Sequence, residues 1–185
     1  MPILRMAKID KKTVNYIFTK LGLITITLLI ILSGLSWYGY KFITDSVRNE
    51  LTSQKIYFPA KDNQFFSPTE FPDIQKYAGQ IVDDGPKSKA YADSFIKKHL
   101  EKIGGGKTYS EISAASLADP TNEVLTQQTQ LMFRGTTLRG MLLTSGYGYW
   151  TMGIIAMYIS VASLIGAGMT AIVVLLGMRK IKNRK

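Results

Sequence analysis

The sequence offers few side chains that could carry out chemistry, and its single histidine is the first to consider. His99 lies in an amphipathic stretch, residues 86–103, on the same face as the apolar side chains. Histidine titrates near neutral pH and often serves as a base or a metal ligand. On an apolar helix face, with no second histidine in the chain, we expect it to pack in a core or an interface. The chain has no cysteine, which excludes thiol catalysis and cysteine-based metal sites.

Two short motifs are similar to ligand-binding loops but lack the complete pattern. Asp83 and Asp84 precede a predicted helix, and paired carboxylates can bind a hard cation. Calcium loops bring several spaced oxygen ligands, so capping of the following helix by one of these acids is the preferred interpretation. The glycine-rich run 104–108 is similar to the end of a phosphate-binding loop, but Glu101 stands where that motif opens with glycine. We therefore predict a flexible turn between helices, and no cofactor and no metal site.

Two arginines are the most suggestive candidates for an interaction. Arg134 and Arg139 interrupt a predicted helix that is otherwise apolar or neutral. Their guanidinium groups could bind lipid phosphate or a carboxylate of a partner. They could also pair within the chain with acids of an earlier helix, such as Asp45 or Glu50, and this internal pairing is the preferred hypothesis. No catalytic constellation is present, and we expect that the protein is not an enzyme.

Two long uncharged segments provide the elements that must position these residues. Residues 21–40 carry no charge, and thirty-nine uncharged residues run from 140 to 178. About 20 helical residues cross a hydrocarbon core of roughly 30 Å. A helix is required there because a lipid-exposed backbone must satisfy its own hydrogen bonds. The sequence thus predicts transmembrane helices at 21–40 and 149–178. A cleaved signal peptide is the alternative for the first segment, but its apolar run exceeds the usual length of about 7–15 residues.

The distribution of charge predicts how these spans are oriented. The net charge is +10, and nine of the ten excess charges lie in the tails 1–20 and 179–185. A nucleic-acid-binding domain would carry its basic stripe through the folded body, so no nucleic acid is expected as a partner. Lys and Arg are retained on the cytoplasmic side during insertion. We therefore expect an inner (plasma) membrane protein with both tails in the cytoplasm and residues 41–148 outside.

Aromatic residues close the first span and open the second. Such side chains prefer the headgroup layer of a bilayer. These predicted interfacial anchors are Trp37, Tyr38, Tyr40, Tyr147, Tyr149 and Trp150.

The second span carries small residues at intervals of four. One row consists of Ala162, Gly166 and Thr170, and a second of Ser163, Ala167 and Ala171. Small residues at this spacing let helices approach closely in lipid. They either pack on the first span around Ser33 and Gly34, which is the preferred interpretation, or form a face for a homo-oligomer or a membrane-protein partner.

The region between the spans is predicted to be a small helical domain. Helices are expected at 40–53, 86–103 and 108–117, and from Asp119–Glu123 into the second span. A helix start is also predicted at Ser67, where Ser-Pro-Thr-Glu matches a capping box. Residues 55–66 favour a connector with at most an edge strand. We expect the first and last of these helices to stand antiparallel, with Asp93 and Lys97 on a solvent-exposed face. Gly146 and Gly148 either hinge the last helix or leave it continuous.

Several runs of sequence carry a resemblance to a known family. They are KIYFP, FPDIQKYAGQIVDDGPKSKAYADSFI, GKTYSEISAASLADP, and FRGTTLRGMLL followed by GYGYW. Over roughly residues 41–160 the chain resembles short two-span bacterial membrane proteins that are common in actinobacteria. Some of them are labelled aromatic ring-opening dioxygenases, a chemistry that needs iron held by histidine and carboxylate ligands. The resemblance implies a topology and no activity.

These observations predict an all-α membrane protein, an antiparallel transmembrane hairpin with a helical extracytoplasmic domain. The leading hypothesis is a non-enzymatic accessory or scaffold component of a membrane assembly in the cell envelope. The alternative is an extracytoplasmic sensor or ligand-binding module, which should contain an apolar pocket where a scaffold should be filled. An envelope enzyme acting on lipid or wall material is the third hypothesis. It requires Arg134, His99 and a carboxylate in one cleft.

Overall fold

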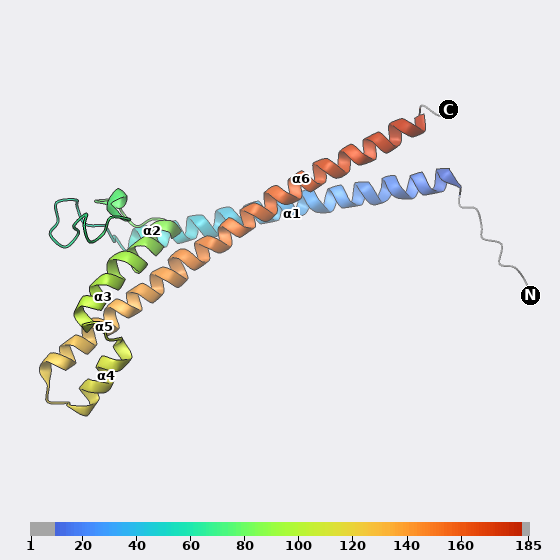
Figure 1. The fold of residues 1–185 in the computed structure, drawn as a ribbon. Helices are drawn as coiled ribbons and strands as arrows, with labels where there is room; N and C mark the ends of the chain where they lie inside the picture. Colours follow the sequence, from blue (N-terminus) through green and yellow to red (C-terminus); the bar gives the residue numbers. More distant parts are fainter. Residues whose placement is uncertain (1–9, 183–185) are drawn as a thin grey trace, which may run out of the picture. The chain divides into compact units, whose positions relative to one another are not determined.

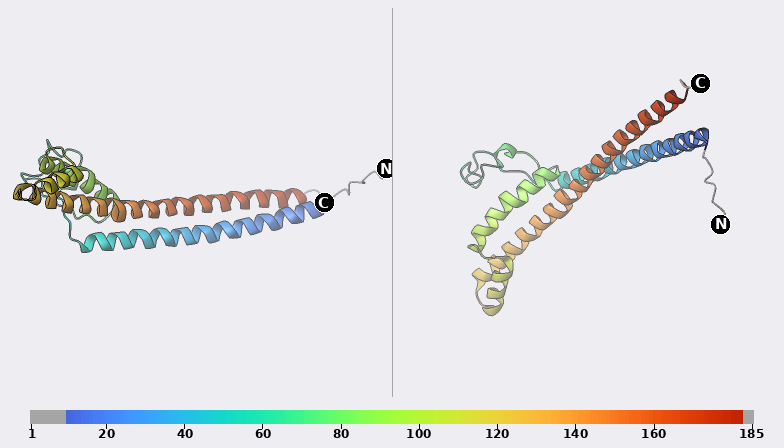
Figure 2. Two further views of the ribbon diagram at one scale, coloured as in Figure 1. Left: turned by 90° about the horizontal axis from the view of Figure 1, so that it is seen from below. Right: turned by 45° about the vertical axis from the view of Figure 1, so that its right-hand side comes forward.

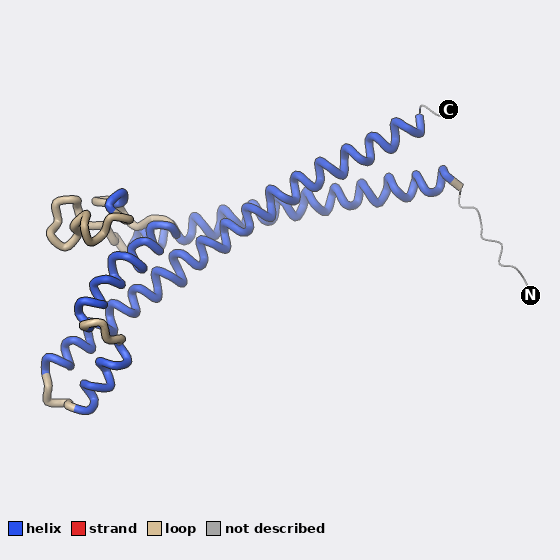
Figure 3. Tube along the Cα trace, viewed as in Figure 1, coloured by secondary structure: helices blue, strands red, loops and turns tan. Residues whose placement is uncertain are grey.

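The described chain, residues 10–182 of a computed structural model, is built from helices and contains no β-strand (Figures 1 and 3). The α-helices are α1 Lys11–Ser53, α2 Gly85–Ala90, α3 Lys97–Gly104, α4 Tyr109–Ala118, α5 Glu123–Met141 and α6 Tyr149–Lys182. A 3-10 helix, η1 Gln75–Tyr77, and two π-helices, η2 Tyr91–Ile96 and η3 Leu142–Gly148, complete the order. The prediction of an all-helical chain is confirmed.

Two of these helical segments are long and apolar enough to cross a membrane. One is α1, and the other is the continuous helix Glu123–Arg179 that joins α5, η3 and α6. The first helix begins at Lys11, ten residues before the predicted span at 21–40, and continues beyond it to Ser53 as expected. The outermost parts of the predicted basic tails, residues 1–9 and 183–185, lie outside the described residues.

The chain divides into two compact units, and α1 and α6 each contribute to both. The first unit comprises the described parts of residues 1–40 and 155–185, and the second comprises residues 41–154.

In the first unit, the two helical segments lie side by side (Figure 2). Phe18 lies beside Gly177, where a Cβ would be 3.5 Å from the ring, and Ser33 bonds Ser160 at 3.1 Å between hydroxyl oxygens. Ser160 also donates to the carbonyl oxygen of Ser33 at 2.8 Å. The two segments therefore run in opposite directions. The two hydroxyl groups hydrogen-bond each other where the helices meet.

In the second unit, α2, η2 and α3 form one unbroken helical stretch, residues 85–104, that packs against α5 and η3. The contacts link Gly104 to Met132 and Leu100 to Gly135, so the two stretches run in opposite directions. A Cβ on Gly135 would lie 2.5 Å from Leu100 Cδ2, which shows how closely the helices approach. The predicted helix at 86–103 is confirmed. It ends at Gly105, whose φ of +57° is the left-handed conformation that glycine adopts readily.

Local capping explains where these helices begin. Asp84 accepts a hydrogen bond from the backbone N–H of Lys87 at 2.7 Å, which confirms the predicted helix cap. Thr108 and Glu111 form the predicted capping box at the start of α4. The last external helix, α5, begins at Glu123, because Asn122 and not Asp119 is its N-cap.

The predicted helix start at Ser67 is wrong, and the reason is local. Ser67 Oγ does accept from the Glu70 N–H, at 3.2 Å, and its carbonyl oxygen accepts from the Phe71 N–H at 2.9 Å. Pro72 follows at once, and proline has no N–H and disfavours a helical conformation at the residue before it. The chain therefore makes one turn and no helix. The possible edge strand is a single antiparallel bridge between Tyr57 and Ile81.

The long connector between α1 and α2 is ordered by buried aromatic and aliphatic side chains. Phe66 and Phe71 stack with ring centroids 5.6 Å apart, and Phe95 of η2 meets both. The core of the second unit consists of Val47, Leu51, Phe58, Phe66, Phe71, Ile74, Val82, Ala92, Ile96 and Leu142. Residues without regular structure thus supply half of this core, and they hold α1 against η2 and η3.

Candidate functional site

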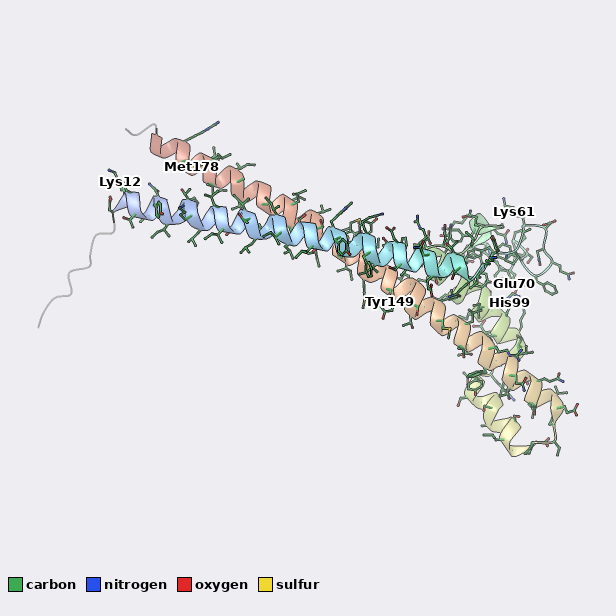
Figure 4. All side chains as sticks on the ribbon, turned by 180° about the vertical axis from the view of Figure 1, so that it is seen from behind. Lys12, Lys61, Glu70, His99, Tyr149 and Met178 are labelled. Atoms are coloured by element: carbon green, nitrogen blue, oxygen red, sulfur yellow. The ribbon has the colours of Figure 1, made fainter. Side chains whose placement is uncertain are left out.

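His99 packs among aromatic side chains, as predicted. Its ring stacks on Phe71 at 5.7 Å and lies 4.4 Å from the Phe95 ring, and Nδ1 is 2.8 Å from the Phe95 carbonyl oxygen (Figure 4). Arg134 lies on α5, one residue before Gly135, which packs closely against Leu100 of α3. Among residues 10–182, no group of three or more His, Asp or Glu side chains could hold a metal ion.

Arg139 makes an internal ion pair, although not with the acids expected. Its Nη2 donates to Asp93 Oδ1 at 2.7 Å, and Lys89 Nζ donates to Asp93 Oδ2 at 2.7 Å. The preferred internal pairing is thus confirmed for Arg139 and not for Arg134, and the choice of Asp45 or Glu50 as the partner is wrong. Asp93 lies opposite Arg139 because residues 85–104 pack against α5 in the reverse direction.

The expectation that Asp93 lies on a solvated face is wrong for the same reason. Asp93 is half-buried between two helices, and Lys97 instead approaches Glu101 at 3.9 Å. The hydrogen bond from Lys89, aided by the one from Arg139, holds the pKa of Asp93 below its ordinary value. This cluster fastens η2 to α5.

Replacing Asp93 by Asn is expected to lower the free energy of unfolding by about 1 kcal/mol at pH 7. The pKa of Asp93 is lower in the folded chain than in the unfolded chain. Its contribution is therefore complete above the ordinary value of 3.8 and is lost as the pH falls through the folded value. Denaturation of the detergent-solubilised protein at pH 7 and at successively lower pH should show the difference and then its decline. As a control, Asp45→Asn removes an exposed pair with Lys41 and should change little. An equal effect of the two variants at pH 7 contradicts the prediction.

Arg134 remains a candidate for binding lipid phosphate or a carboxylate of a partner. Its side chain is exposed on α5. It forms no ion pair with an acid of the described part of the chain.

Gly146 and Gly148 lie within an unbroken helix, which is the second of the two alternatives that the sequence left open. Gly146 is buried, and a Cβ there would lie 2.8 Å from Ser88 Cβ and 3.5 Å from Leu51 Cδ2. Ser88 is fully buried and donates to the carbonyl oxygen of Leu142 at 2.8 Å. This hydrogen bond ties α2 to the first residue of η3. Gly146 provides the space for α2 to approach.

The predicted interfacial anchors differ in their surroundings. Trp37, Tyr38 and Tyr149 are exposed, as anchors in a headgroup layer should be. Two anchors bind cations of the second unit: Lys89 lies 5.0 Å from the Tyr147 ring, and Arg48 lies 5.9 Å from the Trp150 ring. Tyr40 packs on Trp37 with centroids 5.2 Å apart.

The two rows of small residues on α6 differ in their surroundings. Ser163 and Ala167 are buried in the first unit, so this row packs on α1 near Ser33, as preferred. Gly34, the other predicted contact, is exposed. In the other row, Ala162 is exposed, and Gly166 and Thr170 are half-buried, with the Thr170 hydroxyl donating to the Gly166 carbonyl at 2.8 Å.

An apolar groove of about 650 Å³ lies within the second unit and was missed by sequence reasoning. One wall is the end of α1 and the other is the stretch from the end of α5 through η3 to the start of α6, where Figure 4 labels Tyr149. The lining residues are Phe42, Ile43, Ser46, Val47, Glu50, Leu51, Gln54, Met141, Leu142, Ser145, Gly146, Tyr149 and Met152.

The groove is apolar along most of its length and carries one charged side chain. Glu50 is the only lining residue that is charged at neutral pH, and it forms no ion pair with the described residues. Phe42, Met141 and Met152 expose most of their surface. The positions of these apolar residues along the helices did not predict the groove, because a helix that leaves a membrane carries apolar residues in the same pattern.

No protein family, curated protein or solved structure was found to match the chain.

Proposed function

We propose that the chain is a non-enzymatic membrane protein of the bacterial cell envelope, an accessory or scaffold component of a membrane assembly. Residues 21–40 and 149–178 form an antiparallel hairpin that crosses the inner membrane, with both tails in the cytoplasm. Residues 41–148 form an extracytoplasmic helical domain. The resemblance to two-span bacterial membrane proteins and the basic tails support this placement.

One observation carries the proposal: the first unit buries small and hydroxyl-bearing residues and exposes large apolar ones. Leu28 is 61% exposed and Leu164 is 60% exposed, whereas Ser33, Ser160 and Ala167 are buried. A water-soluble helix pair would bury its leucines, because removing them from water drives folding. In lipid that driving force is absent, and close packing of small residues and hydrogen bonds holds helices together. The burial pattern therefore favours lipid as the surroundings of these segments.

Labelling of single cysteines tests the topology, and the cysteine-free chain gives no background. In spheroplasts of a bacterial expression host, a membrane-impermeant maleimide should label Lys61→Cys at once. It should label Lys12→Cys only after the membrane is permeabilised. Recovery of the protein in the soluble fraction, or labelling of Lys12→Cys in intact spheroplasts, would contradict the proposal.

Purification in mild detergent tests the accessory role. The protein should elute with a membrane protein of the envelope, or with further copies of itself, in fixed stoichiometry. Ala162→Phe should break the assembly, because it enlarges an exposed small residue on the face of α6 that is proposed to contact the partner helix. Leu164→Phe, which alters a large side chain that is already exposed, is the matched control. A lone monomer in every detergent would count against the proposal.

The second candidate function is an extracytoplasmic ligand-binding module. It is favoured by one observation, the apolar groove, since a scaffold domain should be filled and a ligand-binding domain should contain a pocket of about 300–1,000 Å³. A binding role for the groove is compatible with either function, because an accessory protein can also hold a ligand.

A further inference from the structure

The polarity of the apolar groove changes from one end to the other. Contacts between Thr44 and Gly153 and between Leu51 and Gly146 fix which residues face each other across it. Phe42 and Ile43 therefore lie at the same end as Met152, and this end is wholly apolar. At the opposite end, Glu50 and Gln54 lie near Ser145.

The direction of this change matches the direction of a lipid in a bilayer. The step that follows rests on the membrane placement proposed above. Phe42 comes two residues after the predicted end of the first span, and Met152 lies within the second span. The Phe42 end of the groove is therefore at the bilayer surface. Eight residues of helix separate Phe42 from Glu50 and carry Glu50 about 12 Å farther out. A lipid drawn outward along the groove keeps its chain toward the membrane and its headgroup toward water.

The charge at the polar end restricts the headgroup. Glu50 is exposed and has no partner among the described acids and bases. The nearest base along the same helix, Arg48, lies against the Trp150 ring. An unpaired carboxylate attracts an ammonium group and repels a headgroup that carries only negative charge. An amine-bearing, zwitterionic phospholipid fits this arrangement better than an anionic one.

We propose that the apolar groove holds one acyl chain of an amine-bearing phospholipid from the outer leaflet, with its ammonium group at Glu50. The bilayer presents such lipids to the Phe42 end at high local concentration, whereas a protein helix would have to bind from dilute solution. Two methionines in the walls can adjust to chains of different length and shape. The protein is thereby a membrane-anchored lipid-binding module.

Native mass spectrometry of the full chain tests this inference. The protein is released from vesicles of phosphatidylethanolamine and phosphatidylglycerol, mixed 3:1 by design, and the retained phospholipids are counted. Wild type is expected to retain one phosphatidylethanolamine. Ser46→Trp, which places an indole in the groove, should reduce retention at least fivefold. Asn49→Trp adds the same side chain to an exposed position of α1 outside the groove and should retain lipid as wild type does.

A charge variant tests the headgroup. Glu50→Gln should reduce the preference for phosphatidylethanolamine over phosphatidylglycerol about fivefold. Glu123→Gln makes the same change at the start of α5 and should leave the preference unaltered. If Ser46→Trp does not fold, Ser145→Phe with Thr144→Phe as its control makes the same comparison on the opposite wall.

Three results would overturn the inference: wild type that retains no phospholipid, equal retention by Ser46→Trp and Asn49→Trp, or a protein partner that is lost with Ser46→Trp while lipid stays bound. The cysteine labelling described above separates this failure from a failure of the proposed function. Correct topology without retained lipid removes the inference alone. A protein that does not enter the membrane removes both.

Discussion

Replacing Phe66 by alanine is expected to lower the free energy of unfolding of the second unit by about 3–5 kcal/mol. Phe66 is fully buried, and its ring meets Phe71 at 5.6 Å and Phe95 at 5.9 Å. The segment around it contains only the three-residue helix η1 between α1 and α2. The backbone hydrogen bonds of this segment belong to turns and to a single bridge, and the buried rings supply the contacts that fix the segment on the helices. The cavity left by the phenyl group cannot be closed without moving the connector.

Phe65 provides a matched control for this measurement. It is the preceding residue, of the same type, and is 62% exposed. Phe65→Ala should change the free energy of unfolding by less than about 0.5 kcal/mol. Both variants are compared with wild type by denaturant titration in detergent, followed by circular dichroism. Limited proteolysis should cut Phe66→Ala within residues 54–84 first. Similar losses for the two variants would contradict the assignment of this core.

Replacing Gly146 by alanine is expected to cost about 1–3 kcal/mol, although alanine is the better helix former. The added Cβ would lie 2.8 Å from Ser88 Cβ and closer still to the Ser88 hydroxyl. Ser88 cannot turn away freely, because it is fully buried and its hydroxyl donates to the Leu142 carbonyl. Either α2 must move away from η3 or this hydrogen bond must break.

Gly140 is the matched control, because a Cβ there would meet no atom within 4 Å. Gly140→Ala should stabilise the helix by up to about 1 kcal/mol, so the two substitutions should have opposite signs. In a Ser88→Gly background, the cost of Gly146→Ala should shrink by at least about 1 kcal/mol, since the overlapping atoms are gone. Thermal denaturation of the four variants measures this coupling. Additive effects would show that Ser88 does not limit the space at Gly146.

The sequence by itself determined the features that depend on neighbours within a turn or two. The two apolar segments, the cap at Asp84, the capping box at Thr108 and the glycine end at residue 105 all follow from local patterns. The error at Ser67 also had a local cause that was present in the sequence, since Pro72 prevents the turn from continuing as a helix.

Tertiary structure alone decided which distant residues meet. Arg139 and Asp93 are 46 positions apart, and Ser88 and Leu142 are 54 apart. Their pairing depends on the direction and the register in which residues 85–104 pack against α5 and η3, and no local propensity specifies either. The apolar groove has the same origin. Each of its walls is an ordinary helix face, and the hollow exists only where the folded chain brings the faces of α1 and η3 together.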